Sequence, residues 1–136
     1  MAGADTGILE LPYEATAAIV DKRFVKLSGD QTIVQCGVAG ELALGVAKTP
    51  ISTSNFQGTN EVTAGKGTAV QILGVAWVEA GAAVSRGAEV TTDTSGRAVT
   101  AATTNRVLGY CLKGTTTGAG DWILVLLAGG FGRILP

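Results

Sequence analysis

The sequence contains no histidine, the side chain most often used as a general base or a metal ligand. Its two cysteines are too few for a structural zinc site. The Gly-x-Gly pairs at Gly65 and Gly118 follow polar turns and precede apolar runs, which is the wrong context for a phosphate-binding loop. The eleven acidic residues are scattered singly, so no carboxylate pair stands out. The sequence therefore predicts a protein that is not an enzyme and that binds no metal or cofactor.

Charge is also scarce, at 15% of the chain against about 25% in an ordinary globular domain. Either part of the surface faces another subunit or a partner, or Thr, Ser and Gly solvate it. The net charge is −1 without a basic cluster, which predicts no binding to nucleic acid. No run reaches the roughly 18 apolar residues of a membrane helix, and the first residues are acidic where a signal peptide carries Lys or Arg. We expect a soluble protein made in the cytoplasm, with no contact to a membrane.

What the chain has in abundance is short β-type runs separated by turns. The segment Asp93-Thr94-Ser95-Gly96 predicts a hairpin, because Gly stands where a positive φ is needed. The almost wholly apolar run 122–127 is typical of a strand buried on both faces. The predicted strands are 24–27, 32–38, 42–47, 61–63, 69–78, 89–92, 97–100, 107–112 and 122–127. Cys36 and Cys111 lie in two of them, and a cytoplasmic origin favours buried thiols over a disulfide.

These strands show an internal repetition. A Leu-Gly pair followed by aliphatic or aromatic and then small residues recurs at 44–47, 73–76 and 108–111. Glycine inside a strand marks a bulge or a close approach of two backbones, which suggests a tightly curved sheet. We predict a mainly β fold: a small β-barrel or barrel-like sandwich with two diverged internal copies, an extended N-terminal arm and a short C-terminal tail.

The predicted boundaries are an arm at 1–23, a body at 24–128 and a tail at 129–136. Pro12 keeps the arm extended, and 14–20 is either a short helix or the lead-in to a strand. The arm is an edge strand of the body or a segment that docks elsewhere. Neither terminal segment shows hairpin patterning, so neither is expected to close the barrel. The polar loop Lys48 to Asn60 is either functional or a tolerated excursion. The candidate partner-binding residues are Ile8, Leu9, Leu11, Tyr13, Phe131, Ile134 and Leu135.

The run AGAAVSRGAEVTTDTSGRAVTAATTNRVLGYCLKG, with GAGDWILVLL after it, resembles the capsid decoration (cement) proteins of tailed bacteriophage heads. The resemblance covers most of 24–127 and is clearer in the second half. It implies a β-rich body, often a homotrimer, seated on the outer face of an icosahedral head. It also implies that terminal arms contact the major capsid protein. The location it implies is the virion, after synthesis in the host cytoplasm.

The expected function is therefore structural: clamping neighbouring capsid subunits and stabilising the capsid. The alternative is a β-sandwich module that binds carbohydrate or a host surface through the loop Lys48 to Asn60 and an exposed tryptophan. Trp77 and Trp122 are the residues that could stack on a sugar, although core anchors are the commoner role for such side chains.

Overall fold

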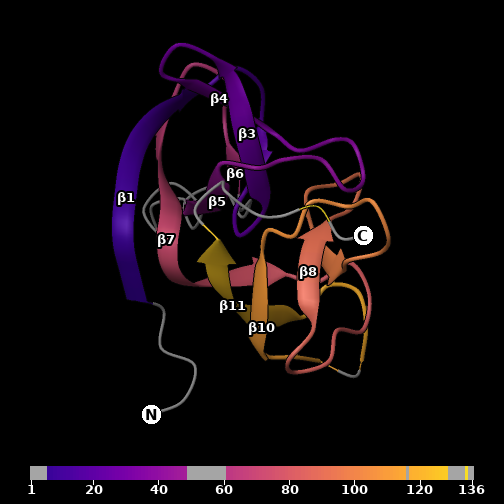
Figure 1. Cartoon of the computed structure of the whole chain (residues 1–136). Helices are drawn as coiled ribbons and strands as arrows, with labels where there is room; N and C mark the ends of the chain where they lie inside the picture. The colour runs from indigo at the N-terminus through magenta and orange to yellow at the C-terminus, as the bar shows by residue number, and fades with distance from the viewer. Residues whose placement is uncertain (1–5, 49–60, 116, 129–133, 135–136) are drawn as a thin grey trace.

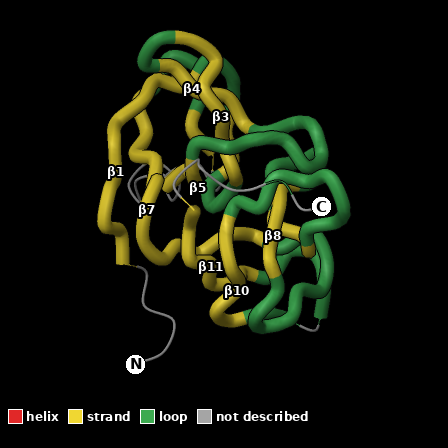
Figure 2. Tube along the Cα trace, in the orientation of Figure 1, coloured by secondary structure: helices red, strands yellow, loops and turns green. Residues whose placement is uncertain are grey.

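The computed structural model describes residues 6–48, 61–115, 117–128 and 134. Regular structure in these ranges consists of β-strands (Figures 1 and 2), and they contain no helix long and apolar enough to cross a membrane. The strands are β1 (Thr6–Ala15), β2 (Ile19–Val20), β3 (Phe24–Gly29), β4 (Thr32–Gln35), β5 (Gly45–Lys48), β6 (Glu61–Val62), β7 (Gly67–Glu79), β8 (Glu89–Thr92), β9 (Ala98–Thr100), β10 (Gly109–Lys113) and β11 (Trp122–Ala128).

The first half of the chain closes into a mixed five-stranded β-barrel. Its strands follow the order β1-β4-β3-β5-β7, and the pairing of β1 with β7 closes the ring. The two closing contacts differ in length: β1 and β7 pair antiparallel from Thr6↔Val75 to Glu14↔Gly67, whereas β1 and β4 pair parallel only around Glu14↔Thr32. β1 is therefore paired with β7 along most of its length but with β4 only at its C-terminal end.

The second half extends the same sheet from the far end of β7. β11 pairs antiparallel with β7 from Trp122↔Glu79 to Ala128↔Leu73, and β10, β8 and β9 follow in that order. A parallel bridge between Ala80 and Ala98 brings β9 back beside the residue that follows β7. In Figure 1 these strands lie below and to the right of the barrel.

The strand β7 supplies side chains to two separate hydrophobic cores. Val70 and Ile72 pack in the barrel core, with residues of β3, β4 and β5. Ala76 and Val78 pack in the second core, which contains much of β8 to β11. Between the two pairs, Gly74 has a φ of +107°, a conformation that side chains rarely adopt. Figure 1 shows β7 curving from the barrel towards the second half, so a single strand serves both halves.

The glycine pattern in the sequence correctly indicated close backbone approaches. A methyl group at Gly45 would collide with the carbonyl oxygen of Gln71, and one at Gly109 would lie 2.6 Å from the carbonyl oxygen of Leu126. Both glycines belong to the recurring Leu-Gly pairs. The predicted barrel is thus confirmed. Gly45 lies in its strand β5 and Gly109 in β10 of the second half, and each lets a neighbouring strand approach closely.

Most predicted strands are confirmed, but two expectations need correction. Residues 6–15 form β1, so the N-terminal segment does close the barrel. Of the two possibilities left open for 14–20, a short helix or the lead-in to a strand, the structure shows the second, since β1 ends at Ala15 and β2 follows at Ile19. The run 122–127 is not buried on both faces, since Trp122 and Leu126 are 51% and 45% exposed. The loop Lys48 to Asn60 lies outside the described residues, except for its first residue in β5. Both cysteines are buried and free, as predicted.

Candidate interaction surface

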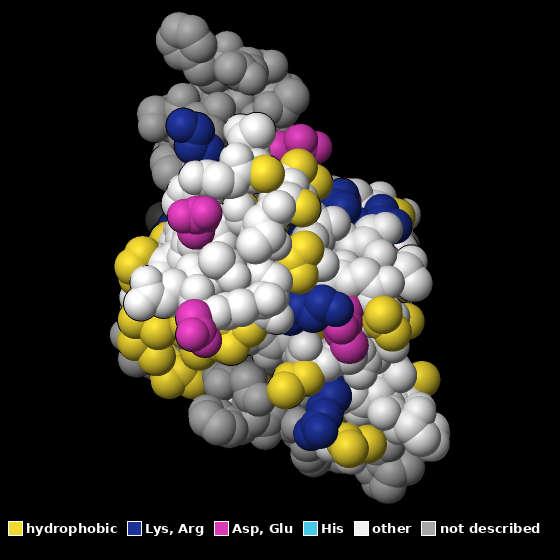
Figure 3. Space-filling model, turned by 90° about the horizontal axis from the view of Figure 1, so that it is seen from above, with side chains coloured by type: hydrophobic (Ala, Val, Ile, Leu, Met, Phe, Trp, Pro, Cys, Tyr) yellow, Lys and Arg dark blue, Asp and Glu magenta, His cyan; other side chains and the backbone are white. Residues whose placement is uncertain are grey.

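Exposed apolar side chains are the surface features of the described residues that suggest a function. The described residues include no group of three or more His, Cys, Asp or Glu that could hold a metal ion. Large hydrophobic side chains with at least a third of their area exposed are found on β1, β3, β7, β10 and β11, and in the loop between β4 and β5. Figure 3 shows hydrophobic side chains gathered on the left flank, the side on which β1 lies in Figure 1.

The strand β1 contributes three of the predicted partner-binding residues. Leu9 and Leu11 are 37% and 38% exposed, and Tyr13 is half-buried against the barrel core. Leu9 faces Leu73 of β7, which is also exposed, so the two form a continuous apolar strip across the strand pair. The side chain of Ile8 is not described. The structure therefore brings Leu9 to the surface and gives Tyr13 a role in packing as well.

The C-terminal tail can be placed only at Ile134. Its side chain is 53% exposed, and its backbone forms an antiparallel bridge with Arg106. Phe131 and Leu135, the other predicted partner-binding residues of the tail, lie outside the described residues. Ile134 is thus held on the surface of the second half, far along the sequence from β1.

A second exposed apolar group, in the β4–β5 loop, was missed by the sequence analysis. Val38 and Leu42 are 59% and 46% exposed, although they stand in a tightly fixed turn. The Glu41 carboxylate accepts hydrogen bonds from the backbone N–H groups of Gly37 and Val38, both at 2.8 Å, and from Lys26 Nζ at 2.6 Å. Because the turn is rigid, these side chains are held outward at little further entropic cost on binding.

The pKa of the Glu41 carboxyl reflects the hydrogen bonds that this turn supplies. Burial alone would raise the pKa of Glu41, but the hydrogen bonds from Lys26, Val38 and Gly37 outweigh it and lower that pKa. The hydrogen bond to Glu41 likewise raises the pKa of Lys26. Gly40, within this turn, has a φ of +78°.

Both tryptophans were expected to be core anchors, and for Trp122 this is wrong. Trp122 lies on the outer face of β11, and the Lys22 ammonium stands 5.2 Å from its ring centroid. Trp77 is half-buried on β7, with Lys113 Nζ 5.6 Å from its ring centroid. Each ring thus has a lysine ammonium within cation–π distance.

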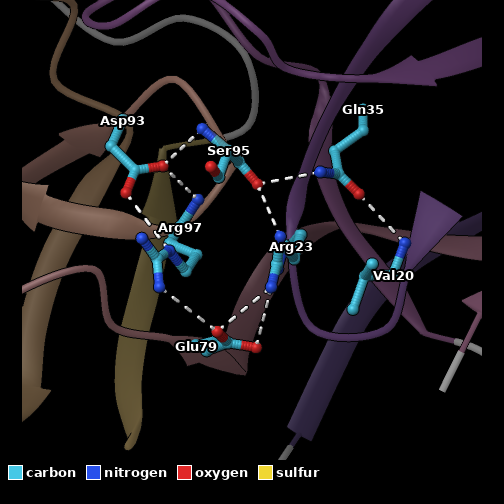
Figure 4. A network of polar contacts seen from close by, with 7 residues as sticks. All are labelled: Val20, Arg23, Gln35, Glu79, Asp93, Ser95 and Arg97. Atoms are coloured by element: carbon cyan, nitrogen blue, oxygen red, sulfur yellow. Dashed lines mark hydrogen bonds and ion pairs between the residues drawn. The ribbon is translucent and has the colours of Figure 1, made fainter. Parts of the chain in front are cut away.

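A polar network holds the two halves in place relative to one another (Figure 4). Glu79, at the end of β7, accepts hydrogen bonds from Arg23 Nη2 at 3.2 and 3.4 Å, and its carboxylate lies 3.8 Å from Arg97 Nη1. Arg23 also donates to the carbonyl oxygen of Ser95 at 3.0 Å, in the β8–β9 turn. Since Arg23 precedes β3, the network joins the barrel to the second half.

The β8–β9 turn itself is fixed by Asp93. Its carboxylate accepts hydrogen bonds from the backbone N–H groups of Ser95 and Arg97, at 2.8 and 2.9 Å. Gln35 of β4 donates to the carbonyl oxygen of Ser95 at 2.9 Å, which is a further link to the barrel. The predicted hairpin at 93–96 is therefore confirmed, and it also acts as a joint between the halves.

Comparisons with known proteins fit this architecture. The family model described as phage cement protein matches residues 4–127. The crystal structure of the head fiber gp8.5 N base of bacteriophage phi29 is similar in fold, with a TM-score of 0.64 and 20% sequence identity. The similarity covers 90% of this chain and 95% of the other. No curated protein matches the sequence.

Proposed function

Because the chain belongs to the phage cement protein family, we propose that it binds the outer surface of an icosahedral phage capsid and clamps neighbouring major capsid subunits. Membership makes it a capsid-associated structural protein of the virion and not an enzyme. The observation that carries the proposal is the extent of the family match, over residues 4–127. A fold shared with the base of a phage head fiber supports attachment to the head.

The proposed contacts with the capsid are the exposed apolar residues of the two terminal segments. Leu9, Leu11 and Ile134 are supported by their exposure on separate parts of the surface. Separate contact sites suit a clamp, because one protein can then touch two capsid subunits. Ile8, Tyr13, Phe131 and Leu135 belong to the same proposal from their positions in the sequence.

A homotrimer is the proposed functional form. Its support is the low charge of the chain and the number of large apolar side chains left exposed on the subunit. Closed cyclic symmetry covers such surfaces without forming fibres. When one subunit of a trimer binds the capsid, the effective concentration of the other two subunits at their capsid sites rises. Three weak contacts on one trimer would therefore bind more tightly than three separate monomers.

We further infer that the body derives from two copies of one unit. The order of the strands supports this: a hairpin, β3–β4 or β8–β9, is followed by a strand that pairs with the first strand of the hairpin and then by a longer strand. The register also corresponds, since Gly45 faces Val25 and Gly109 faces Val90. An experimental structure in which β3–β7 and β8–β11 fail to superpose would refute the duplication.

The direct test is to add the purified protein to phage heads that lack it. We expect it to co-sediment with the heads, to add density to their outer surface in electron micrographs and to raise their resistance to heat. Heads that gain no density would refute the proposal. Binding to a glycan array without binding to heads would favour the carbohydrate-binding module instead.

A further inference from the structure

The strand β1 has an open edge. Along its length β7 pairs with one side, but β4 reaches the other side only at Glu14 and Ala15. Among the described strands, none pairs with that second side between Thr6 and Tyr13. An unpaired edge presents backbone N–H and C=O groups that can extend a sheet by one more strand.

Two backbone hydrogen bonds of β1 show which of its backbone groups face the open side. Glu14 N–H donates to Gln31 on the β4 side, whereas Ala15 N–H donates to Lys66 on the β7 side. Successive residues alternate, so the backbone groups of Pro12 and Glu10 point to the open edge. Pro12 has no N–H, which leaves the Glu10 N–H as the donor of this stretch and the Glu10 and Pro12 carbonyls as acceptors.

Features of this edge limit which strands can pair with it. Pro12 and the register shifts between Gly7 and Glu10 restrict pairing with arbitrary strands, as is usual for protected edges. Between Glu10 and Tyr13 the Glu10 N–H is the one donor that faces the open edge, so a strand that pairs there must place an acceptor opposite it. The edge therefore suits a short segment, not a long β-strand.

The side chains beside the edge indicate the chemistry of that segment. One face of β1 has Leu9 and Leu11, more than a third exposed, and the other has the carboxylates of Glu10 and Glu14. A hollow where β1 meets the β3–β4 turn is lined by Glu14 and Asp30. Among the described residues the Glu10 carboxylate forms an ion pair with Lys48 at 3.7 Å, and because both side chains are more than a third exposed the pair contributes little.

We propose that the open edge of β1 is the docking site for a short extended segment of the major capsid subunit in which basic and apolar residues alternate. The apolar residues of that segment would cover Leu9 and Leu11, and its basic residues would face Glu10 and Glu14. This inference rests on the proposed function, and it adds the mode of contact and the chemistry of the partner.

The substitution Glu10→Pro tests the edge directly, because it removes the outward N–H without removing a hydrogen bond to β7. Glu10→Ala is the matched control, since it removes the same carboxylate and keeps the N–H. In co-sedimentation with heads that lack the protein, we expect Glu10→Pro to bind about tenfold more weakly than Glu10→Ala, the loss typical of one main-chain hydrogen bond. Equal binding of the two variants, both folded by their melting temperatures, would overturn the inference.

Hydrogen exchange of the wild-type protein provides a second readout that does not depend on folding of a variant. The Glu10 amide should exchange quickly in the free protein and slowly on heads. Fast exchange on decorated heads overturns the inference. So does slow exchange in the free protein at high concentration, since a second copy then occupies the edge. Failure of the wild type to bind heads refutes the proposed function itself, and is thereby distinguished from failure of the edge.

Discussion

Replacing Glu79 by Ala removes the carboxylate at the joint between the two halves. Arg23 loses its charged acceptor at 3.2 Å, while Glu79 and Arg23 each keep only 18% of their side-chain area exposed. A hydrogen bond between charged groups contributes about 1.5–3 kcal/mol, and we take the low end because both groups reach solvent. Arg97, at 3.8 Å and 28% exposed, adds at most about 0.5 kcal/mol. The expected loss of unfolding free energy is about 2 kcal/mol.

For a domain of this length about 2 kcal/mol corresponds to a fall in melting temperature of roughly 8 °C. Thermal or urea unfolding followed by circular dichroism measures it, with Glu61→Ala as the control because Glu61 is exposed at the start of β6. Glu79 also lies opposite Trp122, so the single variant mixes two effects. A double-mutant cycle with Arg23→Ala isolates the ion pair. A coupling energy below about 0.5 kcal/mol would refute the reasoning, because the pair would then behave as a solvated surface contact.

Three further predictions follow from packing and burial. Gly45→Ala and Gly109→Ala should each lower the unfolding free energy by about 3 kcal/mol or more in urea titrations, through collision with a neighbouring strand, whereas Gly37→Ala, with open space around it, should not. Burial, with a smaller effect of a nearby carboxylate, raises the pKa of Cys36 to about 12, so the native thiol should resist a thiol reagent that labels the unfolded chain within minutes. The unfolded thiol ionises near pH 9 and the folded one does not, so stability should fall as the pH rises from about 9 towards 12. Deleting residues 1–13 removes most of β1 and should lower the melting temperature strongly; an unchanged value would show that β1 is not part of the barrel.

The strands could be predicted from the sequence because their signals are local. The hairpin at 93–96 needs only Asp93 and Gly96 within a few residues of each other, and the structure confirms it. Pairing between distant strands carries no such local signal. The partner of β1 is β7, some 60 residues later in the chain, and nothing within residues 6–15 specifies it. The N-terminal segment was therefore correctly expected to be extended, and an edge strand of the body was one of the two alternatives left open for it, but its role in closing the barrel was not predicted.

The sequence indicated exposed apolar residues only where they stand in a segment without hairpin patterning, as Leu9 and Leu11 do beside Pro12. Val38 and Leu42 were missed because their exposure depends on Glu41, whose hydrogen bonds hold the turn outward. Trp122 was misjudged for a similar reason. The run 122–127 is apolar at every position, so the sequence could not show that one face of the strand is only partly covered.

The sharing of β7 by two cores has a consequence for how the protein comes apart. Neither half can release its end of β7 without disturbing the strand that the other half needs, because Val70 and Ile72 belong to one core and Ala76 and Val78 to the other. The halves should therefore unfold in a single cooperative transition and exchange their slowest amides together. Local unfolding at one end of the molecule would then destabilise the other end as well. A protein bound to the head would therefore be either fully folded or fully unfolded.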